Sequence, residues 1–288
     1  MDAFKKEFKY YKSRRNVPDL SHVIDFSRPN EFPQLVHRST LATSATSEQF
    51  GITPHVEIPC YEVSSNPGLT VIPNPFTVRG QQMWIQKCLQ LYPTIESATN
   101  VHDDVPRPGP HGKDFSMDFY QKLRWVTLGY HHNWDTKVYD TKNASPFPQC
   151  LRALISHLAE LVGYRNYLPQ AAIVNYYHMD STLSGHVDSS EFAQTLPLFS
   201  ISFGQNAVFL IGASTKEVKP TAIYLRSGDV VVMAGESRLA YHGVPLVLPA
   251  DGEGIWRYST EEESWKPFED YVSKNRININ VRQVFDIR

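Results

Sequence analysis

The sequence predicts an α+β protein built on a double-stranded β-helix (jelly roll), with flanking helices and an N-terminal helical extension. From residue 171 onward, short runs of β-branched and aromatic residues alternate with turn residues, as in an antiparallel all-β region. Before that region, two segments repeat apolar residues at helical spacing. The chain has 288 residues, 41% of them hydrophobic, which is enough for one large core. Two facing sheets are the economical way to arrange such strands.

The first fifteen residues predict a basic helix. Phe4, Phe8 and Tyr11 lie at i, i+4 and i+7, which places them on one helical face. The same stretch carries six basic residues, which are Lys5, Lys6, Lys9, Lys12, Arg14 and Arg15. Two interpretations stay open at this point: a solvated basic face on a helix that docks by its aromatic residues, or an arm that contacts nucleic acid.

The stretch from residue 16 to residue 170 predicts a connection followed by supporting elements. Residues 16–66 are rich in Pro, Ser and Thr without a sustained period, which indicates a wrapping or loosely ordered connection. Gly163 can act as the C′ residue of the last helix in this stretch. Four elements are expected after the connection: a strand at 69–76, a helix at 78–92, an exposed loop at 102–113 and a helix at 151–162.

Turn residues separate the strands of the all-β region. Ser227-Gly228-Asp229 and Gly204-Gln205-Asn206 are strong turn signals. The long run 248–274 predicts an external helix before the last strand. Six strands are predicted: Ala171–Tyr177, Leu198–Phe203, Ala207–Ile211, Thr221–Leu225, Val230–Met233 and Ile277–Val284.

Composition excludes several classes of protein. The net charge of −2 means that any nucleic-acid surface must be a local patch. Cys60, Cys88 and Cys150 are far apart without a C-x-x-C pair, which argues against a zinc knuckle and a disulfide framework and favours a reducing compartment. No stretch approaches the ~18 apolar residues of a membrane span, so we expect no membrane association.

Two side chains in the all-β region can meet one metal ion. His186 and Asp188 are at i and i+2, which point to the same side of an extended strand. A facial triad needs a third ligand, and its open positions distinguish an oxygen-activating Fe(II) site from a closed zinc site. His242 follows the predicted strand 230–233 in a segment that we expect to pair back near the first two ligands.

Other histidines are weaker candidates for the metal site. His131 and His132 are adjacent, so on a strand they would face opposite ways, and we interpret them as loop or groove residues. His178 lies at the end of the predicted strand 171–177 and is interpreted as a hydrogen-bonded sheet histidine.

The last strand predicts an anion site. From Arg276 to Arg282, polar residues alternate with apolar ones, so one face of the strand is cationic. Buried arginines are costly unless an anion meets them. 2-Oxoglutarate would supply one, because its distal carboxylate can accept a bidentate pair from the guanidinium group of Arg276. Asn175 and Tyr177 place an amide and a phenol at i and i+2 on an opposing strand.

In this order, the motifs resemble the AlkB family of oxidative nucleic-acid demethylases over roughly residues 69–284. Further details are similar to the branch represented by AlkB homologue 1, including Leu123-Arg-Trp-Val-Thr-Leu-Gly-Tyr130 and Asn133-Trp-Asp135. The motifs that carry the resemblance are Asn175-x-Tyr177, His186-x-Asp188, Ser227-Gly-Asp-Val-Val-Val-Met233, Ser237-Arg-Leu-Ala-Tyr-His-Gly243 and Arg276-x-Asn-x-x-x-Arg282.

The resemblance implies a site, a chemistry and a division of the chain. It makes His186, Asp188 and His242 the iron ligands, and it places Asn175, Tyr177, Arg276, Asn278 and Arg282 around 2-oxoglutarate. With Fe(II), 2-oxoglutarate and O2, such an enzyme oxidises a methyl group on a base and releases formaldehyde, succinate and CO2. The implied regions are an N-terminal basic helix and wrapping segment (1–66), a substrate-recognition region with supporting helices (67–170) and a jelly-roll core (171–288), with 67–288 as a single catalytic domain.

The resemblance also suggests substrate contacts. A methylated base must be unpaired or flipped out and held between aromatic or apolar walls, for which Trp125, Tyr130 and Trp134 are candidates. Ser190 stands where the bacterial demethylases carry a second acid, so base discrimination is expected to differ. Arg238 is interpreted as a brace for the strand or for the metal site, with a phosphate contact as the alternative.

The expected substrates are methylated bases in nucleic acid, namely 1-methyladenosine in tRNA, N6-methyladenine in DNA, or both. The alternatives are a same-fold oxygenase that acts on protein such as histone tails, a lyase that cleaves abasic DNA, and a binding module with a vestigial site. We expect a monomer in the nucleus, the cytoplasm or both, with mitochondrial residence as a further possibility.

Overall fold

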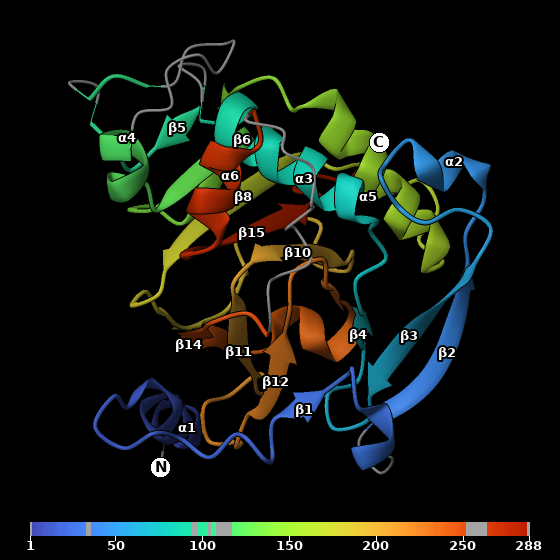
Figure 1. The fold of residues 1–288 in the computed structure, drawn as a ribbon, viewed down its shortest axis with the longest axis vertical. Helices are drawn as coiled ribbons and strands as arrows, with labels where there is room; N and C mark the ends of the chain where they lie inside the picture. Colours follow the sequence, from blue (N-terminus) through green and yellow to red (C-terminus); the bar gives the residue numbers. More distant parts are fainter. Residues whose placement is uncertain are drawn as a thin grey trace.

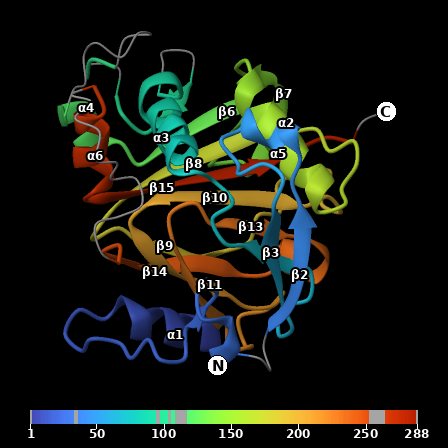
Figure 2. The ribbon, with the colours of Figure 1, turned by 45° about the vertical axis from the view of Figure 1, so that its right-hand side comes forward.

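The computed structural model describes residues 2–32, 36–93, 97–102, 105–107, 117–251 and 264–286. Two β-sheets lie one above the other, with helices on both outer sides (Figures 1 and 2). Within the described ranges, no helix is long and apolar enough to cross a membrane.

The larger sheet has ten strands, nine of them along one path in the order β2-β3-β4-β13-β10-β15-β8-β6-β5, while β7 pairs only with β6. Its pairs are antiparallel. The strands are β2 (Val36–Ala42), β3 (Glu57–Val63), β4 (Leu69–Ile72), β5 (Ala98–Thr99), β6 (Trp125–Asn133), β7 (Val138–Ala144), β8 (Ala171–His178), β10 (Leu198–Gly204), β13 (Val230–Met233) and β15 (Asn275–Arg282).

The smaller sheet has five strands in the order β1-β12-β11-β14-β9. Only its edge pair β1–β12 is parallel. The strands are β1 (Ile24–Asp25), β9 (Leu183–His186), β11 (Asn206–Ile211), β12 (Thr221–Leu225) and β14 (His242–Leu248). The two sheets together form the jelly-roll arrangement predicted from the strand pattern.

Strand β15 shows how the sequence pattern separates the two sides of the larger sheet. Ile277, Ile279 and Val281 are buried in the core beneath the helices. Arg276 and Asn278 instead line a pocket between the two sheets. Because side chains alternate along a strand, every second residue of β15 is available to a site inside the jelly roll. The predicted apolar and cationic faces are therefore confirmed.

Helices cover the larger sheet on the side away from the smaller one (Figures 1 and 2). The core on this side joins buried residues of α3, α5 and α6 to those of β8, β10 and β15. The predicted helices 78–92 and 151–162 are confirmed, and Gly163 has a φ of 88°, as a C′ glycine requires. The helical segments are α2 (Ala45–Glu48), α3 (Val78–Gln86), η2 (Lys87–Leu91), α4 (Met117–Lys122), α5 (Gln149–Leu161) and α6 (Lys266–Val272).

Helix α1 (Ala3–Lys12) covers the outer side of the smaller sheet. Phe4, Phe8 and Tyr11 are buried there against β11, β12 and β14. Phe4 also packs so close to Gly185 that a Cβ atom at this glycine would lie 2.4 Å from its ring. The helix docks by its aromatic residues, as one of the two sequence interpretations required, and its lysines remain exposed.

One expectation about irregular segments is wrong: residues 16–66 are not a loose connection, because β1 joins the smaller sheet and β2 and β3 extend the larger one. The run 248–274 contains the predicted helix as α6, which lies on the outer side of the larger sheet and buries Phe268, Tyr271 and Val272 against the main core (Figure 1). Residues 252–263 and most of the expected loop 102–113 lie outside the described residues. Short 3-10 segments at Pro29–Glu31 and Gly235–Leu239 complete the fold.

Candidate metal centre and cosubstrate pocket

Two histidines from neighbouring strands of the smaller sheet face each other. His186 ends β9 and His242 begins β14, and the two residues are direct partners across the strand pair. Their ring centroids are 4.3 Å apart. The Nδ1 of His186 lies 2.9 Å from the carbonyl oxygen of Ser184, and that of His242 lies 3.0 Å from the carbonyl oxygen of Ala240. A carbonyl can only accept, so each Nδ1 donates its proton and each Nε2 is the ring atom left to face a metal ion.

Asp188 completes the cluster predicted from the sequence. The Nε2 atoms of His186 and His242 each lie 3.9 Å from one of its carboxylate oxygens. One ligand atom from each of the three residues lies within 4.8 Å of the others. Burial raises the pKa of Asp188, but the neighbouring positive charge, above all that of Arg282, outweighs burial and holds that pKa below its ordinary value. The carboxylate is therefore ionised, as a metal ligand must be.

The environment of His242 also favours metal binding. Burial, followed by the neighbouring His186, lowers the pKa of His242 to about 4. The imidazole is consequently neutral at physiological pH and can donate its lone pair. Two neutral imidazoles and one carboxylate are the donor set of a facial triad, which suits Fe(II) and leaves coordination positions open. The residues present therefore fit the predicted iron.

A pocket between the two sheets lies directly beside the triad. His242, Tyr177, Asn278 and Arg276 are among its lining residues, together with apolar side chains from both sheets. Burial raises the pKa of Tyr177, so its phenol stays protonated and can donate a hydrogen bond. The structure thus brings three of the predicted cosubstrate residues together next to one iron ligand.

Arg276 is a buried cation without a carboxylate partner among the described residues. Only 2% of it is exposed, and its guanidinium donates to the carbonyl oxygen of Gln205 at 2.8 Å and to Ser202 Oγ at 2.5 Å. Its Nε atom is buried and has no hydrogen-bond partner within the part of the chain that the structure describes. Burial lowers the pKa of Arg276 to about 10, so it remains charged. An incoming dicarboxylate would supply the missing negative charge.

The surroundings of Arg282 differ from those expected from the sequence. Its side chain is 3% exposed and contacts two protein carboxylates, Asp188 Oδ2 at 3.2 Å and Glu191 Oε1 at 3.0 Å. The inference that both arginines of β15 need an external anion is therefore wrong for Arg282, because the protein compensates its charge. Asn175 lies beside Asn278 on the neighbouring strand but does not line the pocket. For both residues, contact with 2-oxoglutarate stays a prediction.

The predicted substrate contacts divide into two groups. Trp125 and Trp134 have ring centroids 5.5 Å apart, and 51% of Trp134 is exposed. Ser190 lies near this pair, because its Oγ is 3.0 Å from Nε2 of His132, whose ring is 4.7 Å from Trp134. Tyr130 belongs elsewhere: its ring packs edge-on against Phe285 at 5.0 Å.

His132 and Glu191 contact residues of the candidate site although neither was predicted to belong to it: His132 contacts Ser190, and Glu191 accepts hydrogen bonds from Arg238 and Arg282. The adjacent histidines lie on β6 rather than in a loop, and they have different partners, since His131 Nδ1 is 2.7 Å from Thr127 Oγ1. The expectation that they do not share a metal is consistent with this arrangement. Arg238 is 1% exposed, and its guanidinium donates to the main-chain oxygens of Leu196 and Asp188 and to the carboxylate of Glu191, which agrees with a bracing role; its burial argues against a phosphate contact.

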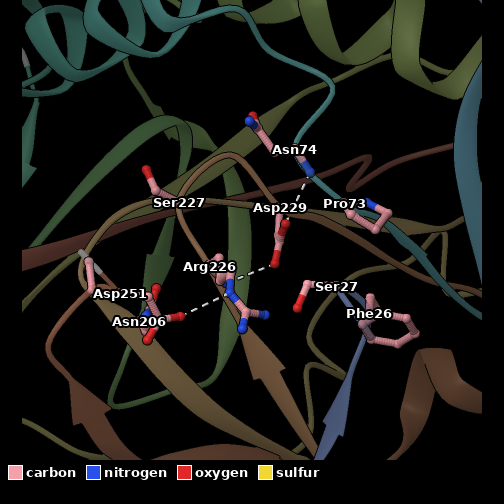
Figure 3. A pocket seen from close by; sticks show the side chains of 10 residues that line it. Phe26, Ser27, Pro73, Asn74, Asn206, Arg226, Ser227, Asp229 and Asp251 are labelled. Carbon is pink, nitrogen blue, oxygen red and sulfur yellow. Dashed lines mark hydrogen bonds and ion pairs between the residues drawn. The ribbon is translucent and has the colours of Figure 1, made fainter. Parts of the chain in front are cut away.

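A second cavity, of about 290 Å³, lies apart from the triad near the turn between β12 and β13 (Figure 3). Arg226 crosses it and bonds to Asp251, while Asp229 accepts hydrogen bonds from the main-chain N–H groups of Asn74 and Arg226. Arg226 also forms a bidentate pair with Asp25 of β1, at 2.5 and 2.9 Å. These contacts join the N-terminal segment to the smaller sheet, so we interpret the cavity walls as structural.

Residues 68–282 match the 2OG-Fe(II) oxygenase superfamily. The chain is 37% identical to the human nucleic acid dioxygenase ALKBH1, over 98% of this chain and 84% of the human one. It is 33% identical to the tRNA demethylase abh1 of Schizosaccharomyces pombe and 29% identical to the DNA N(6)-methyladenine demethylase ALKBH1A of Arabidopsis thaliana, in both cases over 98% of this chain and 96% of the relative.

A solved structure shows the same fold. The structure of OsALKBH1 matches with a TM-score of 0.54 at 20% identity, over 76% of this chain and 97% of that chain. The His-Asp-His cluster, the buried arginine beside it and these likenesses agree: the chain belongs to the 2OG-Fe(II) oxygenase superfamily, in the ALKBH1 branch.

Proposed function

We propose that this protein removes methyl groups oxidatively from bases in nucleic acid, with 1-methyladenosine in tRNA and N6-methyladenine in DNA as the candidate substrates. The observation that carries the proposal is the convergence of two imidazole Nε2 atoms and one carboxylate beside a pocket that holds the buried Arg276. The likeness to relatives named as tRNA and DNA demethylases supports nucleic acid as the substrate class.

The chain's own residues hold the reaction partners. His186, Asp188 and His242 would hold Fe(II). Arg276 would bind the distal carboxylate of 2-oxoglutarate, and Tyr177 would donate a hydrogen bond to the same cosubstrate. When bound, Fe(II) with 2-oxoglutarate and O2 supplies the oxidising chemistry and yields succinate and CO2.

The aromatic residues near the triad favour a base as the substrate. Trp134 is half exposed and packs beside Trp125, which is the neighbour of Asn175 across β6 and β8. An unpaired or flipped base can stack on such a platform, and stacking on an aromatic side chain is worth about 1–3 kcal/mol per base. The platform would hold the methyl group near the metal and help to exclude water from it.

The proposal is tested by measuring succinate and formaldehyde in parallel with three substrates: tRNA containing 1-methyladenosine, DNA containing N6-methyladenine and a methyl-lysine peptide. We expect equal amounts of the two products with a nucleic acid and none above background with the peptide. Formaldehyde released from the peptide and from neither nucleic acid would show that the protein demethylates protein instead. Cleavage of abasic DNA that continues without iron and 2-oxoglutarate would indicate a separate lyase reaction.

A further inference from the structure

A buried carboxylate lies three residues beyond the iron ligand Asp188. The side chain of Glu191 is 0% exposed. Each of its oxygens meets a different arginine: Oε2 lies 3.0 Å from Nη2 of Arg238, and Oε1 lies 3.0 Å from Nη1 of Arg282. Both arginines are buried as well, with 2% and 3% of their side chains exposed. Such a group has no access to a substrate, so any effect on the reaction must pass through its partners.

The same two arginines also hold Asp188. Arg282 extends its Nη2 to within 3.2 Å of Asp188 Oδ2, while Arg238 donates from Nη1 to the main-chain oxygen of Asp188 at 2.6 Å. Arg238 further donates from Nε to the carbonyl oxygen of Leu196 at 3.1 Å. Glu191 thus bridges two guanidinium groups, each of which contacts a different part of the same metal ligand.

The charges in this network are balanced only when Glu191 is present. Two guanidinium groups face two carboxylates, those of Asp188 and Glu191, in a buried region where uncompensated charge is costly. Without Glu191, both positive charges would act on Asp188 alone, and Arg282 would be free to move fully onto its carboxylate. A guanidinium bound in this way competes with a metal ion for the same oxygens.

We propose that Glu191 is a positioning residue for the metal centre: by holding Arg238 and Arg282, it fixes the main chain and the carboxylate of Asp188 in the orientation that binds Fe(II). The inference rests on the metal site of the proposed function but not on the identity of the methylated substrate. Groups that orient a metal ligand commonly change metal affinity by roughly 10- to 100-fold when they are altered.

The test is a titration of the full-length metal-free protein with Mn²⁺, an O2-stable substitute for Fe(II), followed by the electron paramagnetic resonance signal of free Mn²⁺. Glu191→Gln keeps the size of the side chain and removes its charge. We expect its dissociation constant for Mn²⁺ to rise at least tenfold. Arg238→Lys keeps the charge but loses the planar fork, and the same direction of change is expected.

A matched control separates positioning from general loss of stability. Asp25→Asn breaks another ion pair of a buried carboxylate with an arginine, that of Asp25 on β1 with Arg226, which directly follows β12. We expect this variant to lose stability in chemical denaturation while its Mn²⁺ affinity stays within twofold of the parent. Glu191→Gln should combine a loss of stability with a loss of affinity.

Mn²⁺ binding by folded Glu191→Gln within twofold of the parent would overturn the inference. If Glu191→Gln does not fold, Mn²⁺ binding by Arg238→Lys is measured instead, and a dissociation constant within twofold of the parent would overturn the inference. An equal affinity loss in Asp25→Asn would also overturn it, because the effect would then be a general one. A parent that binds Mn²⁺ and releases no formaldehyde from any nucleic acid would contradict the proposed function and leave this inference standing.

Discussion

Arg276 is the residue whose substitution should separate cosubstrate binding from folding stability. In Arg276→Met, an apolar side chain of similar length replaces the buried guanidinium. The variant loses the charge that would meet the distal carboxylate of 2-oxoglutarate, and hydrogen bonds to charged groups contribute about 1.5–3 kcal/mol. The dissociation constant for 2-oxoglutarate should therefore rise by roughly 10- to 150-fold.

The stability of the cosubstrate-free protein should change much less. Arg276 has no carboxylate partner among the residues described, and its burial lowers its pKa to about 10, which indicates that the folded state disfavours its charge. Replacing such a group with an apolar one removes this cost, although Gln205 and Ser202 lose a donor. We expect the free energy of unfolding to change by less than about 1 kcal/mol.

Thermal unfolding with Mn²⁺ bound is the assay, with and without 2-oxoglutarate at 100 times the parent dissociation constant. A ligand at that concentration stabilises the parent by about 2.7 kcal/mol, whereas a variant weakened about 100-fold gains only ~0.4 kcal/mol. The difference corresponds to roughly 5 °C in Tm for a chain of this size. Arg226→Met is the control, because Arg226 has Asp25 as partner: it should lower Tm and keep the shift caused by 2-oxoglutarate.

If Arg276→Met retained the whole shift, Arg276 would not bind the cosubstrate and the assignment of the pocket would be refuted. A shift lost equally in Arg226→Met would point instead to a distortion of the sheet.

Three further predictions concern packing, pH and substrate binding. Gly185→Ala should destabilise the protein by displacing Phe4. Phe4→Ala itself costs about 3–5 kcal/mol. In denaturant titrations, adding Gly185→Ala to the Phe4→Ala variant should cost much less stability than adding it to the parent. Burial raises the pKa of Asp25, but its bonds to Arg226 outweigh burial and lower that pKa. The difference in free energy of unfolding between the parent and Asp25→Asn should therefore have its full size above about pH 4 and vanish as the pH falls further. A difference that does not depend on pH would contradict this. Trp134→Ala should weaken binding of methylated single strands about 5- to 150-fold, and unchanged binding in a fluorescence titration would exclude a stacking role.

Most of the structure that could be predicted followed from the alternation of apolar and polar residues along the strands. On β15, the alternation of Ile277 and Ile279 with Arg276 and Asn278 placed the apolar face against the helices and the polar face in the pocket. This succeeds because the side-chain period of a strand is fixed by its backbone. His242 could be assigned to the triad for a related reason, since a strand that returns across a jelly roll brings distant residues into register.

Residues 36–63 were misjudged because their pattern is weak on its own. In β3, Pro59 and two glutamates interrupt the apolar residues, and the strand is recognisable only once β2 and β4 pair with it. Strand β4 pairs with Tyr61 and Glu62 of β3 but not with Pro59, so the proline lies where the ladder to β4 is already interrupted. Tertiary pairing, rather than local propensity, decides this segment.

The partner of Arg282 could not be found from sequence. An arginine that alternates into the interior requires an anion, but the sequence does not say whether the protein or a ligand provides it. Glu191 is 91 residues away from Arg282, and only the fold brings the two together. The general rule that buried charges are paired holds for Arg282 within the structure, whereas an anionic partner for Arg276 stays a prediction.

The measurement that tests the central claim most directly is the succinate formed per bound iron when O2 is admitted to the protein loaded anaerobically with Fe(II) and 2-oxoglutarate. We predict at least one succinate per iron in the parent protein, and neither iron binding nor succinate in Asp188→Ala. Succinate formation that is undiminished in Asp188→Ala, or absent from an iron-loaded parent with every methylated nucleic acid supplied, would contradict the assignment of the catalytic site.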